Sequence, residues 1–241
     1  MEYNEYRSAL LSAFAQNGLD DLLNEEKAQR LYIFSNILIQ TNKSFNLTAI
    51  TDEKDIILKH FVDCAAVSEY IPESTSIIDV GCGAGFPSIP LAILRDDISV
   101  VSLDSTSKKI GFISDVATEL GLCNISAACH RAEEYAAHHR EQYDVCISRA
   151  VARLNVLDEL CVPLVRVGGL FVAMKSSKGE EEYAEASTGL HKLGCELVTS
   201  DKKTLSLGES TIERDVYVFG KISHTPKEFP RKYAQILKKP L

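Results

Sequence analysis

The stretch that decides the fold reads Ile77-Ile78-Asp79-Val80-Gly81-Cys82-Gly83-Ala84-Gly85-Phe86-Pro87. It begins as a short apolar run rich in β-branched residues, places three glycines at alternate positions, and ends in a proline that opens a helical pattern. This order is typical of a buried parallel strand that enters a tight turn before a helix N-terminus. Glycine suits the turn because the backbone adopts dihedral angles that other residues resist, and because a ligand must approach the bare backbone. The stretch therefore predicts a nucleotide-type cofactor site.

Strand and helix patterns alternate along the chain after this point. We expect seven strands, at residues 77–80, 99–103, 125–129, 145–148, 169–175, 196–198 and 216–219. We expect the intervening helices at residues 88–94, 107–120, 154–161 and 180–193. Such alternation specifies a doubly wound, Rossmann-like α/β sheet. No long helix separates the last two strands, so one of them is expected to run antiparallel.

Helical patterns precede the sheet and a basic segment follows it. Residues 6–14 have amphipathic spacing, Asn24 is a candidate cap for a second helix, and a third is expected to start near Thr51 or Asp52. We therefore predict an N-terminal helical extension at residues 1–72, the α/β domain at 73–222 and a basic tail at 223–241.

The composition argues against several classes of protein. No apolar run approaches the ~18 residues of a membrane span, and the N-terminus lacks the basic and apolar regions of a signal peptide. Seven scattered cysteines without a C-x-x-C pair indicate the reduced thiols of a cytoplasmic protein. His138 and His139 have no cysteine nearby at ligand spacing, so we expect no metal site.

The net charge of −8 is unevenly distributed. From Lys221 to the C-terminus there are six basic residues against one acid, a local charge of +5. A basic tail on an acidic body is a candidate phosphate contact. It is equally compatible with a solvated terminus. Composition leaves both readings open.

The glycine spacing narrows the choice of cofactor. Gly81, Gly83 and Gly85 form G-x-G-x-G, tighter than the G-x-G-x-x-G of dinucleotide folds. This form is common in S-adenosylmethionine sites, where no pyrophosphate has to be held at the helix N-terminus. The second strand ends at Asp104, where an acid can accept hydrogen bonds from both ribose hydroxyls. The alternative role for Asp104 is to cap the helix expected from Ser107.

The residues that follow the third strand are candidates for the adenine side of the same site. In methyltransferase-like folds the backbone and side chain at this point flank the adenine ring, which favours Ala132 and Glu133 as cofactor contacts. Alternatively, Glu133 and Glu134 are first-turn acids favoured by a helix dipole.

The fourth strand ends in Cys146-Ile147-Ser148-Arg149-Ala150, where the reacting base should lie. The Asn/Asp-Pro-Pro-aromatic motif of enzymes that methylate the amino group of adenine is missing here. Cys146 has the parity of a buried strand residue, so we do not expect a nucleophile. What remains is a substrate atom that is already nucleophilic at neutral pH and needs position rather than activation, such as guanine N7.

Arg149 is the leading candidate at this strand end. It could anchor the cofactor carboxylate or hydrogen-bond guanine O6. Alternatively, it only pairs with Asp144 or Glu133. Phe86 offers an aromatic face to the positive charge that develops on the base, or else packs under the turn.

Four further polar residues are expected to line the RNA side of the site, and two of them, Lys175 and Asn46, join Arg149 as candidate catalytic residues. The four are Lys175 at the end of the fifth strand and, in the helical extension, Asn46, His60 and Asp63. Each is also plausible as a cap or a surface residue.

With these residues in place, the chain resembles the ribosomal small-subunit RNA guanine-N7 methyltransferases of the glucose-inhibited division B family. The resemblance runs from Asn46 to about Pro230. Its motifs are Phe45-Asn46-Leu47-Thr48, Lys59-His60-Phe61-Val62-Asp63, the glycine stretch from Asp79 to Pro90, Leu103-Asp104-Ser105, Arg131-Ala132-Glu133, Ser148-Arg149-Ala150-Val151-Ala152 and Pro226-Lys227-Glu228-Phe229-Pro230-Arg231-Lys232. Several motifs in order are far more specific than one glycine turn.

The resemblance implies a seven-stranded sheet of the S-adenosylmethionine-dependent methyltransferase type. It also implies methyl transfer to N7 of one guanine in the decoding region of small-subunit (16S) ribosomal RNA, free or within the 30S subunit. The residues it implies as cofactor contacts are Gly81, Phe86, Ala132, Glu133 and Arg149. The chain departs from relatives at Cys82, usually a small hydroxyl residue or alanine, and at Tyr233-Ala234-Gln235, often a glycine-proline segment.

Two other functions are compatible with a fold of this kind. One is a nicotinamide-dependent oxidoreductase, which the short glycine spacing disfavours. The other is a non-catalytic RNA-binding or ribosome-assembly module with a vestigial cofactor pocket. The sequence retains the glycine turn, Asp104 and Arg149, which argues against a vestigial cofactor pocket.

Overall fold

The computed structural model describes residues 1–149, 151–176 and 179–241. The α-helices are α1 (Tyr3–Gln16), α2 (Glu25–Asn42), α3 (Glu53–Ile56), α4 (Asp63–Ala65), α5 (Ser88–Leu94), α6 (Ser107–Glu119), α7 (Ala132–Tyr135), α8 (Leu154–Cys161), α9 (Gly179–Lys192) and α10 (Tyr233–Lys238). The strands are β1 (Ser76–Val80), β2 (Ser99–Asp104), β3 (Ile125–Cys129), β4 (Tyr143–Arg149), β5 (Val165–Lys175), β6 (Cys195–Leu207) and β7 (Ser210–Lys221).

The strands form one seven-stranded sheet in the order β3-β2-β1-β4-β5-β7-β6. The first five strands pair in parallel, and β7 is antiparallel to both β5 and β6. The predicted doubly wound α/β sheet and its antiparallel member are thus confirmed. The chain order reverses at β1, whose neighbours are β2 and β4, so a crevice opens at the carboxyl ends of these strands.

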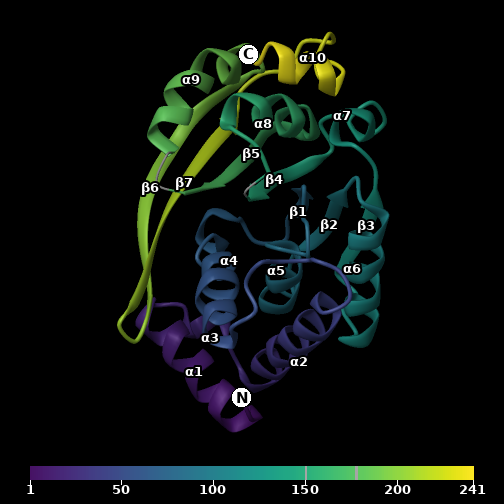
Figure 1. The fold of residues 1–241 in the computed structure, drawn as a ribbon. Helices are drawn as coiled ribbons and strands as arrows, with labels where there is room; N and C mark the ends of the chain where they lie inside the picture. Colours follow the sequence, from purple (N-terminus) through teal and green to yellow (C-terminus); the bar gives the residue numbers. More distant parts are fainter. Residues whose placement is uncertain (150, 177–178) are drawn as a thin grey trace.

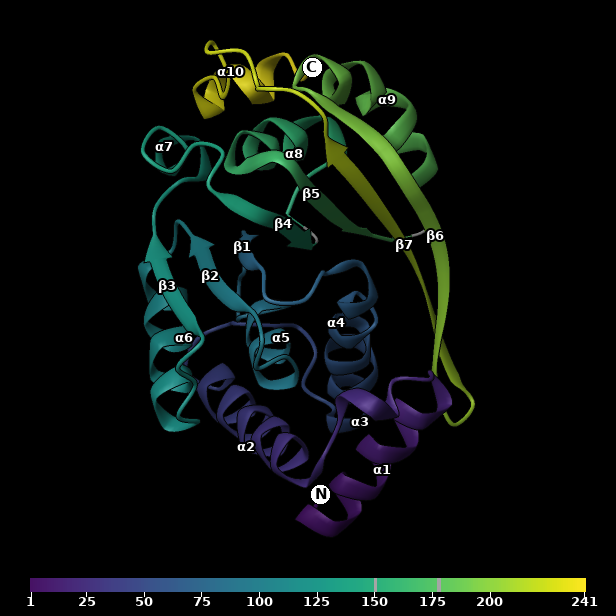
Figure 2. The same cartoon turned by 180° about the vertical axis from the view of Figure 1, so that it is seen from behind.

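Helices cover both faces of the sheet (Figures 1 and 2). One face packs Ile77, Val145 and Val172 against the helices that precede the sheet together with α5 and α6. The other face packs Ile78, Cys146 and other strand residues against α8 and α9. Buried residues of the helical extension belong to the same core cluster as the first face, so the extension and the sheet bury their apolar surfaces together.

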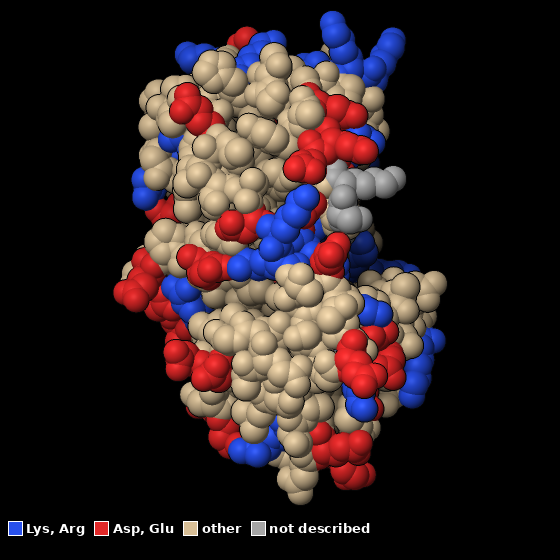
Figure 3. Space-filling view, turned by 90° about the vertical axis from the view of Figure 1, so that its left-hand side faces the viewer, with Lys and Arg blue, Asp and Glu red and all other residues tan. Residues whose placement is uncertain are grey.

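The last two strands are much longer than expected, and the short ranges predicted for them are wrong. Beyond the sheet, β6 and β7 continue as a two-stranded hairpin that reaches α1 (Figure 1). There the Asn17 side chain donates to the Ser206 carbonyl at 2.7 Å and accepts from the Ser206 amide at 2.9 Å. Figure 3 views the molecule from the hairpin side, where Lys and Arg side chains gather across the middle of the face with acidic side chains around them.

The third predicted helix is continuous but irregular. Between α3 and α4 the residues Ile57–Val62 form a π-helical segment. Such segments are often found at functional sites, and this one carries Lys59 and His60. The Asn24 cap is confirmed, since its side chain accepts a hydrogen bond from the Lys27 amide at 2.9 Å.

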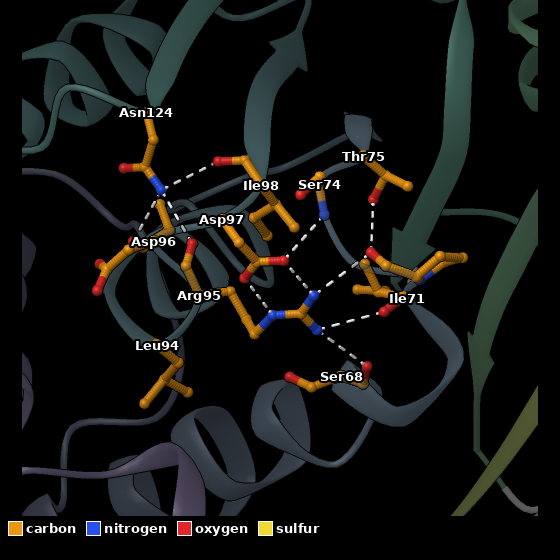
Figure 4. Close-up of polar contacts among 12 residues, drawn as sticks. Ser68, Ile71, Ser74, Thr75, Leu94, Arg95, Asp96, Asp97, Ile98 and Asn124 are labelled. Atoms are coloured by element: carbon orange, nitrogen blue, oxygen red, sulfur yellow. Dashed lines mark hydrogen bonds and ion pairs between the residues drawn. The ribbon is translucent and has the colours of Figure 1, made fainter.

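Arg95, directly after α5, ties the end of the helical extension to the sheet (Figure 4). Its guanidinium binds the Asp97 carboxylate at 2.6 and 2.7 Å and donates to the carbonyls of Ser68 and Ile71 at 3.3 Å. Nearby, the Asn124 amide bridges the carbonyls around the start of β2. The Arg95 bonds to Ser68 and Ile71 hold the end of the helical extension against the segment that leads into β2.

Two basic residues, Lys221 at the end of β7 and Arg231 in the tail, are held in ion pairs with acids of the body. Lys221 is buried and lies 3.1 Å from Glu141, and Arg231 lies 2.5 Å from the fully buried Glu159. The tail is therefore docked on the body, and α10 packs on α8.

Candidate functional site

The glycine turn joins β1 to α5 and is fastened to the end of β2, because the Gly81 amide donates to the Leu103 carbonyl at 2.8 Å. Gly81 has φ +75°, and a Cβ there would lie 2.3 Å from the Val151 side chain. Gly85 has φ +87°, and a Cβ there would lie 2.4 Å from Ile89. Gly81 and Gly85 therefore disfavour a side chain for two reasons: the backbone is left-handed there, and neighbouring side chains pack closely against it.

Asp104 ends β2 beside this turn. Its carboxylate accepts hydrogen bonds from the Gly83 amide at 3.2 Å and from the Thr106 amide at 2.9 Å. The N-cap of α6 is Thr106, so the alternative role of Asp104 as helix cap is not observed. The bond to Gly83 fixes the carboxylate against the turn, and one carboxylate has further lone pairs to accept ribose hydroxyls.

Three adjoining cavities lie along the carboxyl ends of the parallel strands. The turn cavity, about 340 Å³, is lined by Gly81, Gly83, Phe86, Asp104 and Arg149 among others. The adenine-side cavity, about 250 Å³, is lined by Asp104, Ala132, Glu133, Leu160 and Tyr233 among others. The basic cavity, about 470 Å³, is lined by Lys59, His60, Asp63, Arg149, Lys175 and Arg214 among others. Val151 lines all three, so they form one groove.

Arg149 joins the turn cavity to the basic cavity. Its guanidinium donates to the Asp63 carboxylate at 3.0 Å, to the Lys59 carbonyl at 3.1 Å and to His60 Nδ1 at 3.0 Å. The alternative prediction, that Arg149 pairs with Asp144 or Glu133, was wrong. Asp144 instead binds Arg166 at 2.6 Å. The arginine is thus oriented by the π-helical segment and α4, across the interface between the helical extension and the sheet.

His60 is neutral in this arrangement. An arginine always donates, so Nδ1 accepts from Arg149 and Nε2 carries the proton toward the Thr48 hydroxyl at 3.1 Å. Burial, and then the Arg149 guanidinium, lower the pKa of His60 to about 3. Both ring nitrogens are engaged, so His60 positions Arg149 rather than exchanging protons.

Phe86 is buried beneath these side chains. Its ring stacks on His60 with centroids 4.1 Å apart, and the Arg149 guanidinium lies 5.2 Å from its centroid. The ring therefore packs under the turn and braces His60 and Arg149. It still lines the turn cavity.

Lys175 and Asn46 lie in different surroundings. Lys175 ends β5, lines the basic cavity, and contacts Glu182 at 2.8 Å and the Ala152 carbonyl at 2.5 Å. Asn46 is exposed in the loop after α2 and does not line any of the three cavities, whereas its neighbours Leu47 and Thr48 line the turn cavity.

Cys146 is fully buried in β4, and burial raises the pKa of its thiol well above the ordinary range. It is inert for nucleophilic chemistry. Ala150, in the motif that follows, lies outside the described residues.

Arg214 is a site residue that the sequence patterns did not reveal. It lies on β7 in the basic cavity, and its Nε donates to the Asp63 carboxylate at 3.1 Å. The alternation of Ile212, Arg214 and Val216 was the available signal, and the range predicted for this strand began too late to include it.

Metal-binding groups and membrane-spanning helices are both absent from residues 1–149, 151–176 and 179–241. No group of three or more His, Cys, Asp or Glu residues in these ranges is arranged to hold a metal ion. None of the helices described there is both long enough and apolar enough to cross a bilayer.

Solved structures share this fold at low sequence identity. M. jannaschii TYW2 in complex with AdoMet superposes with a TM-score of 0.54 at 14% identity, over 66% of this chain and 75% of that one. A precorrin-6y C5,15-methyltransferase from Geobacter metallireducens superposes with a TM-score of 0.50 at 14% identity, over 67% and 88%. The fold is that of the S-adenosylmethionine-dependent methyltransferases.

Sequence relatives narrow the class to a family. The family model described as rRNA small subunit methyltransferase G (GidB) matches residues 27–207. Proteins named ribosomal RNA small subunit methyltransferase G are 46% identical in Staphylococcus aureus strain Newman, over 91% of this chain and 92% of the relative, and 41% identical in Clostridium botulinum, over 98% and 99%. The chain belongs to the rRNA small subunit methyltransferase G family, which confirms the resemblance seen in the sequence.

Proposed function

We propose that this protein transfers the methyl group of S-adenosylmethionine to N7 of a guanine in small-subunit ribosomal RNA, as free RNA or within the 30S subunit. Membership of the methyltransferase G family supports the RNA substrate. The observation that supports the choice of atom is the basic cavity, where basic side chains predominate and the described side chains that could accept a proton are already paired.

The turn and adenine-side cavities fit the cofactor. In this proposal Asp104 accepts the ribose hydroxyls, Gly81 and Gly83 leave the backbone open to close approach, and Ala132 and Glu133 contact the adenine; all five residues line these two cavities. The cofactor supplies an electrophilic methyl group on a cationic sulfonium. The chain's part is to hold it so that this methyl group faces the basic cavity, because orientation is the main catalytic contribution available here.

The basic cavity fits a nucleotide. Lys59, Arg149, Lys175 and Arg214 line it, against the acids Asp63 and Glu182. The excess of cations favours phosphate, and an arginine can also donate to guanine O6. Residues from the helical extension, β5 and β7 all contribute, so the cavity exists only in the assembled fold.

Each described side chain of the basic cavity that could remove a proton from the base is already engaged. His60 is neutral with both nitrogens engaged, Asp63 is paired with Arg149 and Arg214, and Glu182 is paired with Lys175. Guanine N7 carries a free lone pair and has no proton to lose. It can therefore attack the methyl group in line without base catalysis, whereas an exocyclic amine would need an acceptor.

The substrate class is tested by incubating purified protein with methyl-labelled S-adenosylmethionine and separated ribosomal subunits. Label should enter small-subunit RNA and not large-subunit RNA. Cofactor binding without transfer to either subunit would instead favour the non-catalytic assembly module. Binding of NAD in place of S-adenosylmethionine would favour the oxidoreductase.

A further inference from the structure

The C-terminal tail places one side chain in the cofactor groove. Tyr233, the first residue of α10, lines the adenine-side cavity together with Leu103, Asp104, Ala132 and Leu160.

Buried charges dock the tail at this position. The Arg231 backbone amide and guanidinium both bind the fully buried Glu159 on α8, with contacts between 2.5 and 3.1 Å. Arg140 donates to the carbonyls of Phe229 at 2.6 Å, Pro226 at 3.0 Å and Thr225. Arg140 thus holds the backbone that leads into α10.

Apolar contacts fix the helix itself. Ile236 is fully buried in a cluster with Val156 and Leu160, and Tyr233 packs against that cluster one helical turn away. The Arg131 guanidinium lies 5.5 Å from the Tyr233 ring centroid, a cation–π distance. The ring is therefore held between the helix core and Arg131 at the edge of the cavity.

We propose that Tyr233 forms part of the wall against which the adenosine half of S-adenosylmethionine binds, so that the docked tail is a cofactor-binding element. The inference rests on the proposed use of S-adenosylmethionine. An aromatic ring offers a purine a stacking or edge contact that is independent of hydrogen bonding. Among the other lining residues, Ala132 and Leu160 are small or aliphatic and supply only packing, and His130 is the second aromatic side chain.

The test is calorimetric binding of two ligands to the full-length protein. S-adenosylhomocysteine carries adenosine and an amino acid moiety, whereas 5′-methylthioadenosine lacks the amino acid. Tyr233→Ala should raise the Kd of both by the same factor, roughly 5- to 100-fold, as expected for a lost aromatic contact to a base. Tyr233→Leu keeps the apolar bulk and the helix propensity, so it removes the aromatic ring while the tail stays docked. It should raise both Kd values as Tyr233→Ala does, even if the alanine variant also undocks the tail.

Leu237→Ala is the matched control, because Leu237 is 52% exposed on the same helix. It should leave both Kd values within twofold. Unchanged Kd values in both Tyr233 variants, or a loss confined to S-adenosylhomocysteine, would overturn the inference. A wild-type protein that binds neither ligand would overturn the proposed function as well. A Tyr233 effect on the KM for RNA alone would show that the tail acts on the substrate instead, and so would also overturn the inference.

Discussion

The Asp63 carboxylate lies 3.0 Å from the Arg149 guanidinium and 3.1 Å from that of Arg214. Asp63 comes from α4, Arg149 from the end of β4 and Arg214 from β7. One 2% exposed carboxylate therefore orients two arginines that line the basic cavity. Because Asp63 belongs to the helical extension, its ion pairs link that extension to two arginines at the edge of the sheet.

We expect Asp63→Asn to leave both arginines without their counter-charge. Removing one partner of a buried ion pair costs about 3 kcal/mol of unfolding free energy. Misplaced guanidinium groups should lower kcat/KM for RNA by roughly 100-fold, with a smaller change in cofactor Kd. Urea unfolding, methyl transfer and calorimetry measure the three quantities. The exposed neighbour of Arg214, Glu213, gives the control Glu213→Gln, and equal activity of the two variants would contradict the role assigned to Asp63.

Asp104→Asn tests the ribose contact. The amide keeps the shape but loses a charged acceptor, a change worth about 1.5–3 kcal/mol, or roughly 10- to 100-fold in Kd for S-adenosylhomocysteine. Asp115→Asn, an exposed acid on α6, should leave the Kd unchanged. An Asp104 variant that binds as tightly as wild type would show that the ribose is held elsewhere.

Cys146→Ala tests the exclusion of covalent catalysis. The thiol is fully buried and its pKa is raised, so methyl transfer should stay within a few-fold of wild type. The small cavity should cost about 1 kcal/mol of stability. Activity reduced by several hundred-fold in a folded variant, with RNA trapped covalently on the wild-type enzyme, would assign Cys146 a nucleophilic role.

Burial of the Asp158 carboxyl group should make the stability of the protein depend on pH. Burial raises its pKa to about 8, against about 3.9 in an unfolded chain. The folded state retains the proton, so this contribution to stability is complete below about pH 4 and is lost as the pH rises toward 8. Asp79, with a pKa raised to about 7, acts in the same direction.

The matched variant is Asp158→Asn, which stays neutral at every pH. Its unfolding free energy relative to wild type should rise by about 1 kcal/mol or more between pH 5 and pH 9, measured by urea unfolding at each pH. Asp115→Asn should follow the wild-type pH profile. Parallel profiles for the Asp158 variant and wild type would contradict a buried, protonated Asp158.

Local chemistry made much of the fold predictable, including the turn and the strand end that the proposed cofactor site uses. The glycine turn, the acid at the end of β2 and the Asn24 cap each depend on residues close together in the chain. The basic cavity was harder to predict from the sequence. Asp63 and Arg214 are far apart in the chain, and they meet only because β7 pairs with β5 in the observed register. Sequence alone could not show that contact.

The hairpin and the tail show the same limit. The outer parts of β6 and β7 form a two-stranded ribbon beyond β5 in which charged and polar residues separate the few apolar ones, such as Leu205 and Ile212, so they lack the apolar run that marked the inner strands. The charges of Lys221 and Arg231 were visible, but their partners Glu141 and Glu159 were not. Net charge in a tail indicates phosphate binding only when its partners within the fold are known.

The central claim is the atom that receives the methyl group. The most direct test takes 30S subunits from cells that lack this gene, treats them with the purified protein and S-adenosylmethionine, and maps N7-methylguanine by chemical cleavage of the RNA. We expect one new N7-methylguanine in small-subunit RNA, absent when either the protein or the cofactor is omitted. Methylation of a different atom, or no methylation of that RNA by protein that binds the cofactor, would contradict it.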